Sequence, residues 1–458
     1  MLACRSPSGA PMFHPTIPFL AAILAPISCE HSPPPPCAPV ACIEEPGPEP
    51  PDPWVKELAS ATVIAAGDIL MHGPVVASAR AADEIVDGVS TNHGGYDALF
   101  SSIRAPIQGA DLAFVNLETP ISPSGTQRRS MIFNAEPALL DAVVATGFDV
   151  VSLANNHIYD QGRRGLIETL DAIEARGELI PVGAAQSCDE AEGGKMIEVN
   201  GLKIAWLAAS ELFNNYLNAD RGEACAFLMD VDQLLIRVQA AKEAGAEVVV
   251  LSLHWGDEYE IEPAPRHTRA AHRLIEGGVD LILGHHAHVV QPVEIIPTPD
   301  GRIGVVVYGM GNLISNQSAW YVPGLHDPSD GNPRDGLMVS LRLVRRRHGR
   351  AERAVIRTEI SDLQVIPTWT LNNQLERRRG ADPQIRVVPL LTRINDLQAQ
   401  LDLGASSDAT IVSLSRELDE MERRWRIVGG IVGAHLLPER PPELPAPAAP
   451  PAEELDEG

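Results

Sequence analysis

A series of short apolar segments restricts the folds open to this chain more than any other feature. Residues 62–66, 111–115 and 149–153 are brief and hydrophobic almost throughout, as strands buried on both faces of a sheet are. Segments with helical spacing separate them, and this alternation predicts an α/β domain. Further strands are expected at residues 203–208, 248–253, 281–283 and 303–308, and helices at 137–146, 165–175, 231–244 (with Asp232 as N-cap) and 268–277.

Polar clusters directly follow five of these predicted strands. Groups just beyond the carboxyl ends of strands converge at one edge of an open α/β sheet, where binding sites form. We therefore expect these clusters to meet in one site, although they are spread over more than two hundred positions. The clusters are Gly67-Asp68, Asn116-Leu117-Glu118, Asn155-Asn156-His157, His254-Trp255-Gly256 and Gly284-His285-His286-Ala287-His288.

The residue types in these clusters are those that hold divalent metals. Carboxylates supply charge, imidazoles supply directional nitrogen donors, and an amide adds a neutral oxygen. Two neighbouring cations would also need a shared carboxylate, because their mutual repulsion must be offset, and Glu118 is the best-placed bridge. Singly, each motif could be a loop cap or a surface histidine, and only their joint occurrence indicates a shared site. The candidate metal ligands are Asp68, Glu118, Asn156, His254, His286 and His288.

His157 is a candidate for acid catalysis. It directly follows the amide ligand Asn156, so it can lie near the metals without binding them and protonate a leaving oxygen. Asp160, three residues further on, is placed to hold the other ring nitrogen and raise its basicity. We predict that His157 and Asp160 form the catalytic pair.

These motifs together resemble those of the CapA family of poly-γ-glutamate capsule synthesis proteins, which are related to the calcineurin-like metallophosphoesterases. The resemblance covers residues 62–315 and continues along the following strands to about residue 391. It implies an α/β fold of four layers, an α-β-β-α sandwich of two mixed sheets. The motifs are the five clusters above, extended by Asp160, Gly162, Glu258, Tyr259 and Val289, and Gly309-Met310-Gly311-Asn312.

The resemblance also implies a role for each ligand. Asp68 would bind a first metal, Glu118 would bridge, and Asn156 and His254 would bind a second metal, with His286 and His288 completing the pair. The sequence departs from the phosphoesterase pattern, because residue 70 is Leu where that pattern has His, and Glu118 replaces the bridging Asp. The number of divalent cations, one or two, and their identity (Mn, Fe, Zn or Mg) therefore remain open, as does the choice between His285 and His286 as ligand.

Two functions follow from these observations. The family likeness implies a role in poly-γ-glutamate synthesis or export, with an anionic polymer as substrate and membrane-bound capsule proteins as partners. The alternative is a metal-dependent phosphoesterase or other hydrolase acting on an envelope substrate, and whether the chain is an enzyme stays open. Acidic residues outnumber basic ones by 61 to 36, so nucleic acid would be repelled and is not expected as a partner. An anionic polymer would need the metal and arginines such as Arg128, Arg129, Arg163 and Arg164 to attract it.

The ends of the chain predict export to the cell envelope. Residues 1–29 have the layout of a signal peptide, either of the lipoprotein type with lipidation at Cys29 or an ordinary secretory signal. A Pro-rich linker is expected at 30–57, the main domain at 58–318, and further strands at 319–392, of which 354–366 and 386–391 should complete the second sheet. A helical segment with a solvated face is expected at 393–435 and a disordered acidic, Pro-rich tail at 436–458.

The six cysteines do not form zinc-finger spacings. In an oxidising compartment, Cys188 could pair with Cys225, and Cys37 with Cys42.

Overall fold

The first sheet is built on one long strand, β1 (Val55–Ile69). It pairs parallel with β4 (Leu112–Leu117) on one side and antiparallel with β16 (Asp335–His348) on the other. The eight strands follow the order β18-β17-β16-β1-β4-β5-β6, and the short strand β15 also pairs with the end of β1. The remaining members are β5 (Val150–Ser152), β6 (Ile180–Val182), β15 (Asn312–Ile314), β17 (Val355–Asn372) and β18 (Ile385–Pro389).

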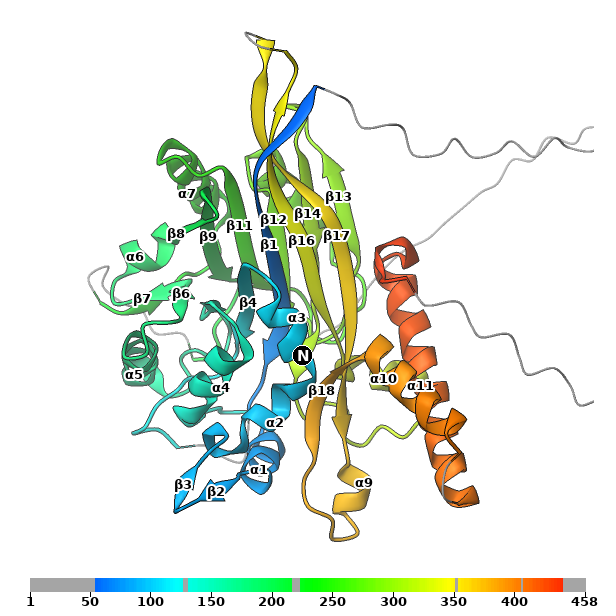
Figure 1. Cartoon of the computed structure of the whole chain (residues 1–458). Coiled ribbons are helices and arrows are strands. Elements are labelled where there is room, and N and C mark those ends of the chain that lie inside the picture. Colours follow the sequence, from blue (N-terminus) through cyan, green and yellow to red (C-terminus); the bar gives the residue numbers. More distant parts are fainter. Residues whose placement is uncertain (1–53, 127–130, 216–222, 351–352, 405–406, 440–458) are drawn as a thin grey trace, which may run out of the picture. The chain divides into compact units, whose positions relative to one another are not determined.

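The computed structural model describes residues 54–126, 131–215, 223–350, 353–404 and 407–439, all within one unit, Asp52–Gly458. Figure 1 shows these residues in colour. The predicted signal peptide with Cys29, the Cys37–Cys42 pair, Arg128 and Arg129, and the tail beyond 439 lie outside the described residues. Among the helices described, none combines the length and apolar character needed to span a bilayer.

The second sheet has six strands in the order β13-β14-β12-β11-β9-β8. Its four central strands run parallel, and the two edge strands pair antiparallel with them. The predicted strands at 203–208, 248–253, 281–283 and 303–308 all fall within it. The members are β8 (Lys195–Val199), β9 (Leu202–Ser210), β11 (Val248–Trp255), β12 (Leu281–His286), β13 (Val293–Pro297) and β14 (Ile303–Val307).

Three separate cores define four layers. Alternate residues of β1 face opposite sides: Ile64 and Ala66 pack with helices, whereas Val63 and Ala65 pack against the second sheet. Residues of β9 alternate likewise between the inter-sheet core and the core under helices α7 and α8. The strands are therefore apolar throughout because both faces are covered, and the predicted α-β-β-α sandwich of two mixed sheets is confirmed.

Helices cover the outer faces of both sheets (Figure 1). On the first sheet these are α1 (Gly73–Ala81), α2 (Asp97–Phe100), α3 (Arg104–Gln108), α4 (Ala138–Thr146) and α5 (Gly162–Glu174); α7 (Val231–Glu243) and α8 (Pro265–Glu276) cover the second. The other α-helices are α6 (Cys188–Gly193), α9 (Gln374–Arg377), α10 (Leu390–Asp402) and α11 (Asp408–Val432). Two small antiparallel strand pairs are the hairpin of β2 (Ile85–Val86) and β3 (Val89–Ser90), and β7 (Ala184–Ala185) with the more distant β10 (Cys225–Ala226).

A disulfide joins Cys188 of α6 to Cys225 of β10, with their Cα atoms 5.2 Å apart. The pairing expected for these two cysteines is therefore confirmed.

Four expectations need correction. Residues 354–366 and 386–391 do not complete the second sheet: β17 and β18 extend the first sheet, because β16 returns along the open edge of β1.

The N-cap of α7 is Asp230, whose carboxylate accepts from Gln233 N, whereas Asp232 lies inside the first turn. Strand β1 begins at Val55, inside the predicted linker. Helix α11 is not merely solvated, since Met421, Trp425 and Arg424 are buried.

Candidate metal centre

Strands from both sheets deliver the predicted ligands to one place. Asp68, one residue before the end of β1, lies beside Asn116 of β4 in the parallel register. Glu118 is the first residue after β4. From the second sheet, His254 near the end of β11 is paired with His285 of β12. Parallel neighbouring strands end at the same edge, so their final side chains meet there. The convergence expected from the strand-end positions is therefore present.

Asp68 lies at the centre of a fully buried hydrogen-bond network. Its Oδ1 is 2.7 Å from Nδ1 of His285 and accepts a 2.9 Å hydrogen bond from Nδ2 of Asn116. Its Oδ2 accepts from the backbone N–H of His286 at 3.3 Å and lies 3.5 Å from Nδ1 of His288. These contacts fix the orientation of the Asp68 carboxylate.

Glu118 differs from Asp68 because neither of its oxygens has a hydrogen-bond partner among the described residues, although both are buried. Its Oε1 lies 3.6 Å from Nε2 of His254 and 3.8 Å from Nε2 of His288. These distances exceed those of hydrogen bonds, whereas ligand atoms sharing an ion at bonds of about 2.0–2.2 Å lie roughly 3–3.5 Å apart. Glu118 is thus surrounded by potential ligands.

Two groups of three potential ligands share Glu118. One consists of Asp68, Glu118 and His288, the other of Glu118, His254 and His286, and within each group the ligand atoms lie within 4.8 Å of one another. Such an arrangement is what a carboxylate between two cations requires. Oδ1 of Asn156 lies 3.1 Å from Nε2 of His254 and so belongs beside the second group.

The pKa values indicate that a positive charge would fit this cluster. Burial, and then the nearby Asp68 carboxylate, raise the pKa of Glu118 well above its usual range. Burial opposes ionisation of Asp68, but the charge and hydrogen bond of His285 outweigh it and hold the pKa of Asp68 well below its usual range. Burial lowers the pKa of His254 well below its usual range, and lowers that of His286 to about 4. Neutral imidazoles are the form that binds metals.

The residues present therefore fit a divalent cation. The fit rests on orphaned buried atoms, since Nδ1 of His286 joins both Glu118 oxygens in having no hydrogen-bond partner among the described residues. Buried polar groups normally have hydrogen-bond partners, and a buried group without one indicates a site for a water or an ion. A cation would supply the charge and the bonds that these atoms otherwise lack.

His157 and Asp160 form a close buried pair beside this cluster. Nδ1 of His157 is 2.8 Å from Oδ2 of Asp160, which also accepts from the backbone N–H of Phe133 at 2.6 Å. The Phe133 ring lies 4.3 Å from the His157 ring and limits its rotation. His157 contributes to the lowered pKa of His286, which places the pair near the cluster. Nε2 of His157 is consequently the nitrogen left for a bound molecule.

Several residues of this region were not predicted as site residues. Glu258 forms a third potential ligand group with His286 and His288, and Asn312 Oδ1 lies 3.1 Å from Nδ1 of His288. Both belong to the family motifs, which was the only signal for them. Asn116 supports Asp68 from inside a strand, and Asn214 Nδ2 lies 3.5 Å from Nδ1 of His157. Asn214 belongs to no motif, and sequence patterns offer no sign of it.

Backbone strain is concentrated at this edge of the sheets. His286 and His288 have φ angles of 85° and 57°, and Tyr259 on the adjoining loop has φ 67°. Residues other than glycine rarely adopt this left-handed conformation, and where they do the strain often accompanies a functional site.

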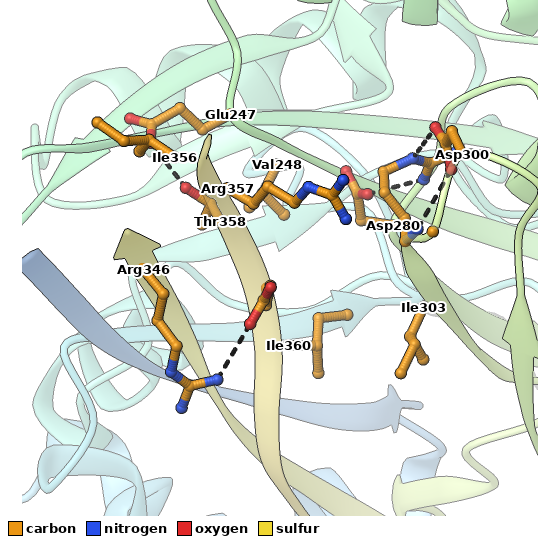
Figure 2. A pocket seen from close by; sticks show the side chains of 13 residues that line it. Glu247, Val248, Asp280, Asp300, Ile303, Arg346, Ile356, Arg357, Thr358 and Ile360 are labelled. Carbon is orange, nitrogen blue, oxygen red and sulfur yellow. Dashed lines mark hydrogen bonds and ion pairs between the residues drawn. The ribbon is translucent and has the colours of Figure 1, made fainter. Parts of the chain in front are cut away.

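A cavity away from these ligands appears in Figure 2. Its volume is about 590 Å³, and it is lined by the starts of β11, β12 and β14 and by β16 and β17, whereas His254 and His286 lie at the opposite ends of β11 and β12. Its charged side chains largely neutralise one another: Arg302 pairs with Asp280 and Asp300, and Arg346 with Glu359. The charged groups of this cavity are therefore largely paired, whereas the Glu118 carboxylate is not, and the cluster around Glu118 is the better candidate for a reactive site.

Fold and site together define an α/β sandwich protein with a candidate divalent-cation centre between its sheets. The profile of the family described as "Bacterial capsule synthesis protein PGA_cap" matches residues 62–317, more than half of the chain. The chain belongs to this family, and the resemblance stated from the sequence motifs is confirmed.

Curated relatives carry related descriptions. The capsule biosynthesis protein CapA of Bacillus anthracis is 28% identical over 270 residues, and the PGA biosynthesis protein CapA of Bacillus subtilis is 27% identical over 268 residues. Each match covers 57% of this chain but only 61% and 65% of those proteins, less than two thirds of their length. A probable polyglutamine synthesis accessory protein of Mycobacterium tuberculosis is 28% identical over 272 residues, covering 53% of this chain and 68% of that protein.

Solved structures with a similar arrangement include the calcineurin-like phosphoesterase YfkN from Bacillus subtilis, at 10% identity and a TM-score of 0.32, covering 80% of this chain and 99% of that chain. A putative 5'-nucleotidase from Staphylococcus aureus matches at 12% identity and a TM-score of 0.37, covering 72% of this chain and 54% of that one. At scores this low, the fold assignment depends on the strand order and the layered cores described above.

Proposed function

We propose that this chain acts in the synthesis or export of poly-γ-glutamate at the cell envelope, through a site that binds one or two divalent cations. Family membership and the descriptions of the relatives support the polymer. The observation that carries the cation site is the Glu118 carboxylate, buried without a hydrogen-bond partner among the described residues and shared by two potential ligand groups.

The ligands divide between the two groups. Asp68, Glu118 and His288 would hold one cation, and Glu118, Asn156, His254 and His286 the other. His285, whose Nδ1 contacts Asp68, would orient that carboxylate instead of binding. A bound cation supplies Lewis acidity and lowers the pKa of water. Manganese, iron, zinc and magnesium all accept such mixed oxygen and nitrogen donors.

His157 would serve as the acid of this site. Asp160 accepts a hydrogen bond from Nδ1–H of His157 at 2.8 Å, which keeps that proton on Nδ1 and aims Nε2 away from Asp160. The acid form of the ring is then the imidazolium, which carries a second proton on Nε2. Phe133 packs on the ring and restricts its motion. His157 would then protonate the oxygen that leaves when an ester bond is broken.

The same pair favours a second candidate function, a metal-dependent phosphoesterase or other hydrolase acting on an envelope substrate. A polymer-binding factor without chemistry would not need a buried His–Asp pair beside a cation site. The two functions are compatible where hydrolysis serves polymer synthesis. A lipid anchor at Cys29 and contacts with membrane-bound capsule proteins would place either activity at the envelope.

Gene deletion with complementation tests the polymer function. Wild-type protein should restore the γ-linked polymer to a deletion strain, whereas Glu118→Gln should not, although both accumulate equally. Glu198→Gln, on the exposed part of β8, is the matched control and should restore it. An unchanged polymer yield on deletion contradicts the polymer function, and full restoration by Glu118→Gln contradicts the role of the cation site.

Turnover of p-nitrophenyl phosphate or bis-p-nitrophenyl phosphate by the purified protein with Mn²⁺ tests the second candidate. A rate that disappears with a chelator and returns with Mn²⁺ would establish a phosphoesterase. Cation binding without turnover of either ester would argue against it.

A further inference from the structure

A cavity of about 420 Å³ adjoins the cluster of candidate ligands. The two share a wall: Gln317 Oε1 accepts a 2.8 Å hydrogen bond from Asn312, whose Oδ1 lies 3.1 Å from Nδ1 of His288. Tyr259 lines the cavity with its ring 6.2 Å from the His288 ring. A molecule in the cavity would therefore extend towards the cations. The lining side chains used below are Tyr259, Gln317, Ser318, Trp320, Asp330 and Asn332.

Two exposed aromatic rings stand on this cavity. Trp320 is 50% exposed and Tyr259 49% exposed, whereas Trp206, Trp255 and Trp369 are fully buried. Each exposed ring is held in place, Trp320 by an edge contact with His326 at 5.1 Å and Tyr259 by a 3.3 Å hydrogen bond from Gln317. Fixed, solvent-facing rings offer apolar faces for a flat or cyclic ligand to pack on.

Apart from the apolar Val289 and Pro333, the remaining lining groups are neutral hydrogen-bonding groups and one carboxylate. Gln317 and Asn332 contribute amides, Ser318 a hydroxyl and Asp330 the carboxylate, and no lining residue among those described carries a positive charge. Arg163 and Arg164, expected to attract an anionic polymer, pair instead with Glu223 and Glu168. A chain with one carboxylate per residue would be repelled here, whereas a ring bearing several hydroxyls would be satisfied.

The cavity is also held rigid from behind. Arg424 of the buried helix face donates to the backbone oxygen of Pro328 at 2.6 Å and to Asn332 Oδ1 at 2.7 Å. Both contacts hold the turn that carries Asp330. Ser318 has φ 50° and, with Tyr259, adds left-handed backbone to the cavity wall. A preformed wall reduces the entropy lost when a ligand binds.

We propose that this cavity binds a sugar ring of the substrate, stacked on Trp320 and hydrogen-bonded to the amides and Asp330. The substrate of the cation site is then a sugar-containing molecule whose anionic or ester group reaches the cations, and not a bare γ-glutamyl chain. This inference rests on the proposed function for the direction in which the substrate extends. The sugar is part of a glycan chain or of a small sugar phosphate.

Calorimetric titration of the purified full-length chain in Mn²⁺ and in chelator tests the inference. The probes are tetra-N-acetylglucosamine, glucose 1-phosphate, a γ-linked penta-glutamate and choline. At least one sugar should bind wild type, and Trp320→Ala should weaken that binding about tenfold or more, the order expected for a lost stacking contact. Trp320→Phe should recover most of it. Trp54→Ala is the matched control: Trp54 is 44% exposed but precedes the start of β1, far from Asp68 at its end.

The outcomes separate the possibilities. Binding of the tetrasaccharide alone indicates a glycan source, and binding of glucose 1-phosphate alone a small sugar ester. Binding of neither sugar overturns the inference, as does equal sugar binding by Trp320→Ala, or Trp320-dependent binding of choline or penta-glutamate. Manganese measured in the same samples reports on the cation site separately, so loss of the sugar site and loss of the cation site are distinguishable.

Discussion

At the scale of single residues, Glu118 determines what the site can be. A buried carboxylate without hydrogen-bond donors is destabilising by several kcal/mol unless a positive charge compensates. Asp68, equally buried, has its donors in Asn116 and His285, and its pKa is lowered accordingly. The opposite pKa shifts of the two neighbouring carboxylates fit a site in which protein donors compensate Asp68 and a cation would compensate Glu118.

The doubled histidine provides one prediction at this scale. Because His286 belongs to two potential ligand groups and His285 contacts Asp68, His286→Ala should weaken Mn²⁺ binding more than about a hundredfold. His285→Ala should weaken it about 10–100-fold, as changes to residues that orient ligands do. Calorimetric titration with Mn²⁺ measures both. The reverse order of effects would place His285, not His286, on the cation.

The His157–Asp160 pair provides a second prediction at the scale of single residues. On any ester that the protein hydrolyses, His157→Ala should lower kcat about 10²–10⁴-fold, because the leaving oxygen loses its acid. Asp160→Asn should lower it about 10–100-fold, and neither change should alter the cation content. His272→Ala is the control, since His272 is 43% exposed and contacts Glu294 on another surface. Unchanged turnover in His157→Ala would remove the residue from the mechanism.

At the scale of elements, α11 shows how a charged helix can stabilise a site without touching it. Its Arg424 is fully buried and pairs with Asp335, while burial raises the pKa of that carboxyl to about 6. The same guanidinium holds the turn behind the sugar-binding cavity. Figure 1 shows α10 and α11 beside the strands β17 and β18, with which they share a small core.

Removing the Arg424 guanidinium should destabilise the folded protein. Arg424→Ala leaves Asp335 buried without its partner, which should lower the free energy of unfolding by about 3–5 kcal/mol. Arg426→Ala, at an exposed position of the same helix, should change it by less than about 1 kcal/mol. Urea unfolding at neutral pH measures both. Equal effects of the two substitutions would contradict a specific role for the buried pair.

Helix α5 holds a loop near the site through one carboxylate. Glu168 accepts from the hydroxyls of Ser122 at 2.5 Å and Ser124 at 2.6 Å, and these bonds lower its pKa to about 2. A lowered folded-state pKa adds stability that is present above the unfolded value of about 4.3 and is lost as the pH falls towards 2.

Glu168→Gln should therefore lower the free energy of unfolding by about 1 kcal/mol near neutral pH. The gap between wild type and variant should shrink below about pH 4 and vanish near pH 2. Glu174→Gln, exposed on the same helix, should show no such pH-dependent gap. Urea titrations across this pH range measure the effect, and a constant gap would contradict it.

At the scale of the whole molecule, the sequence predicted the layers better than the pairings. Strands buried on both faces are apolar throughout, so β1, β4, β9 and β11 were recognisable. The position of β17 in the first sheet was not recognisable. The alternation of strand-like and helical segments indicates which residues form strands, but not that β16 runs back along β1.

The site shows the same division. Asp68, Glu118 and the histidines follow strands, so their convergence was predictable. Asn116 and Glu258 appeared in the motifs, but neither was predicted to take part in the site, because Asn116 lies within β4 and Glu258 on an exposed loop. The cavity at Trp320 combines segments separated by about sixty positions, and only the folded chain brings them together.

Elemental analysis of the purified full-length chain measures the bound cation directly. After dialysis against metal-free buffer, wild type should retain one or two equivalents of a divalent metal, Glu198→Gln should retain the same, and Glu118→Gln should lose at least one. Circular dichroism should show that both variants are folded. A wild-type protein that retains no divalent metal even after incubation with manganese, iron or zinc, or a Glu118→Gln variant that retains the full amount, would contradict the cation site around Glu118.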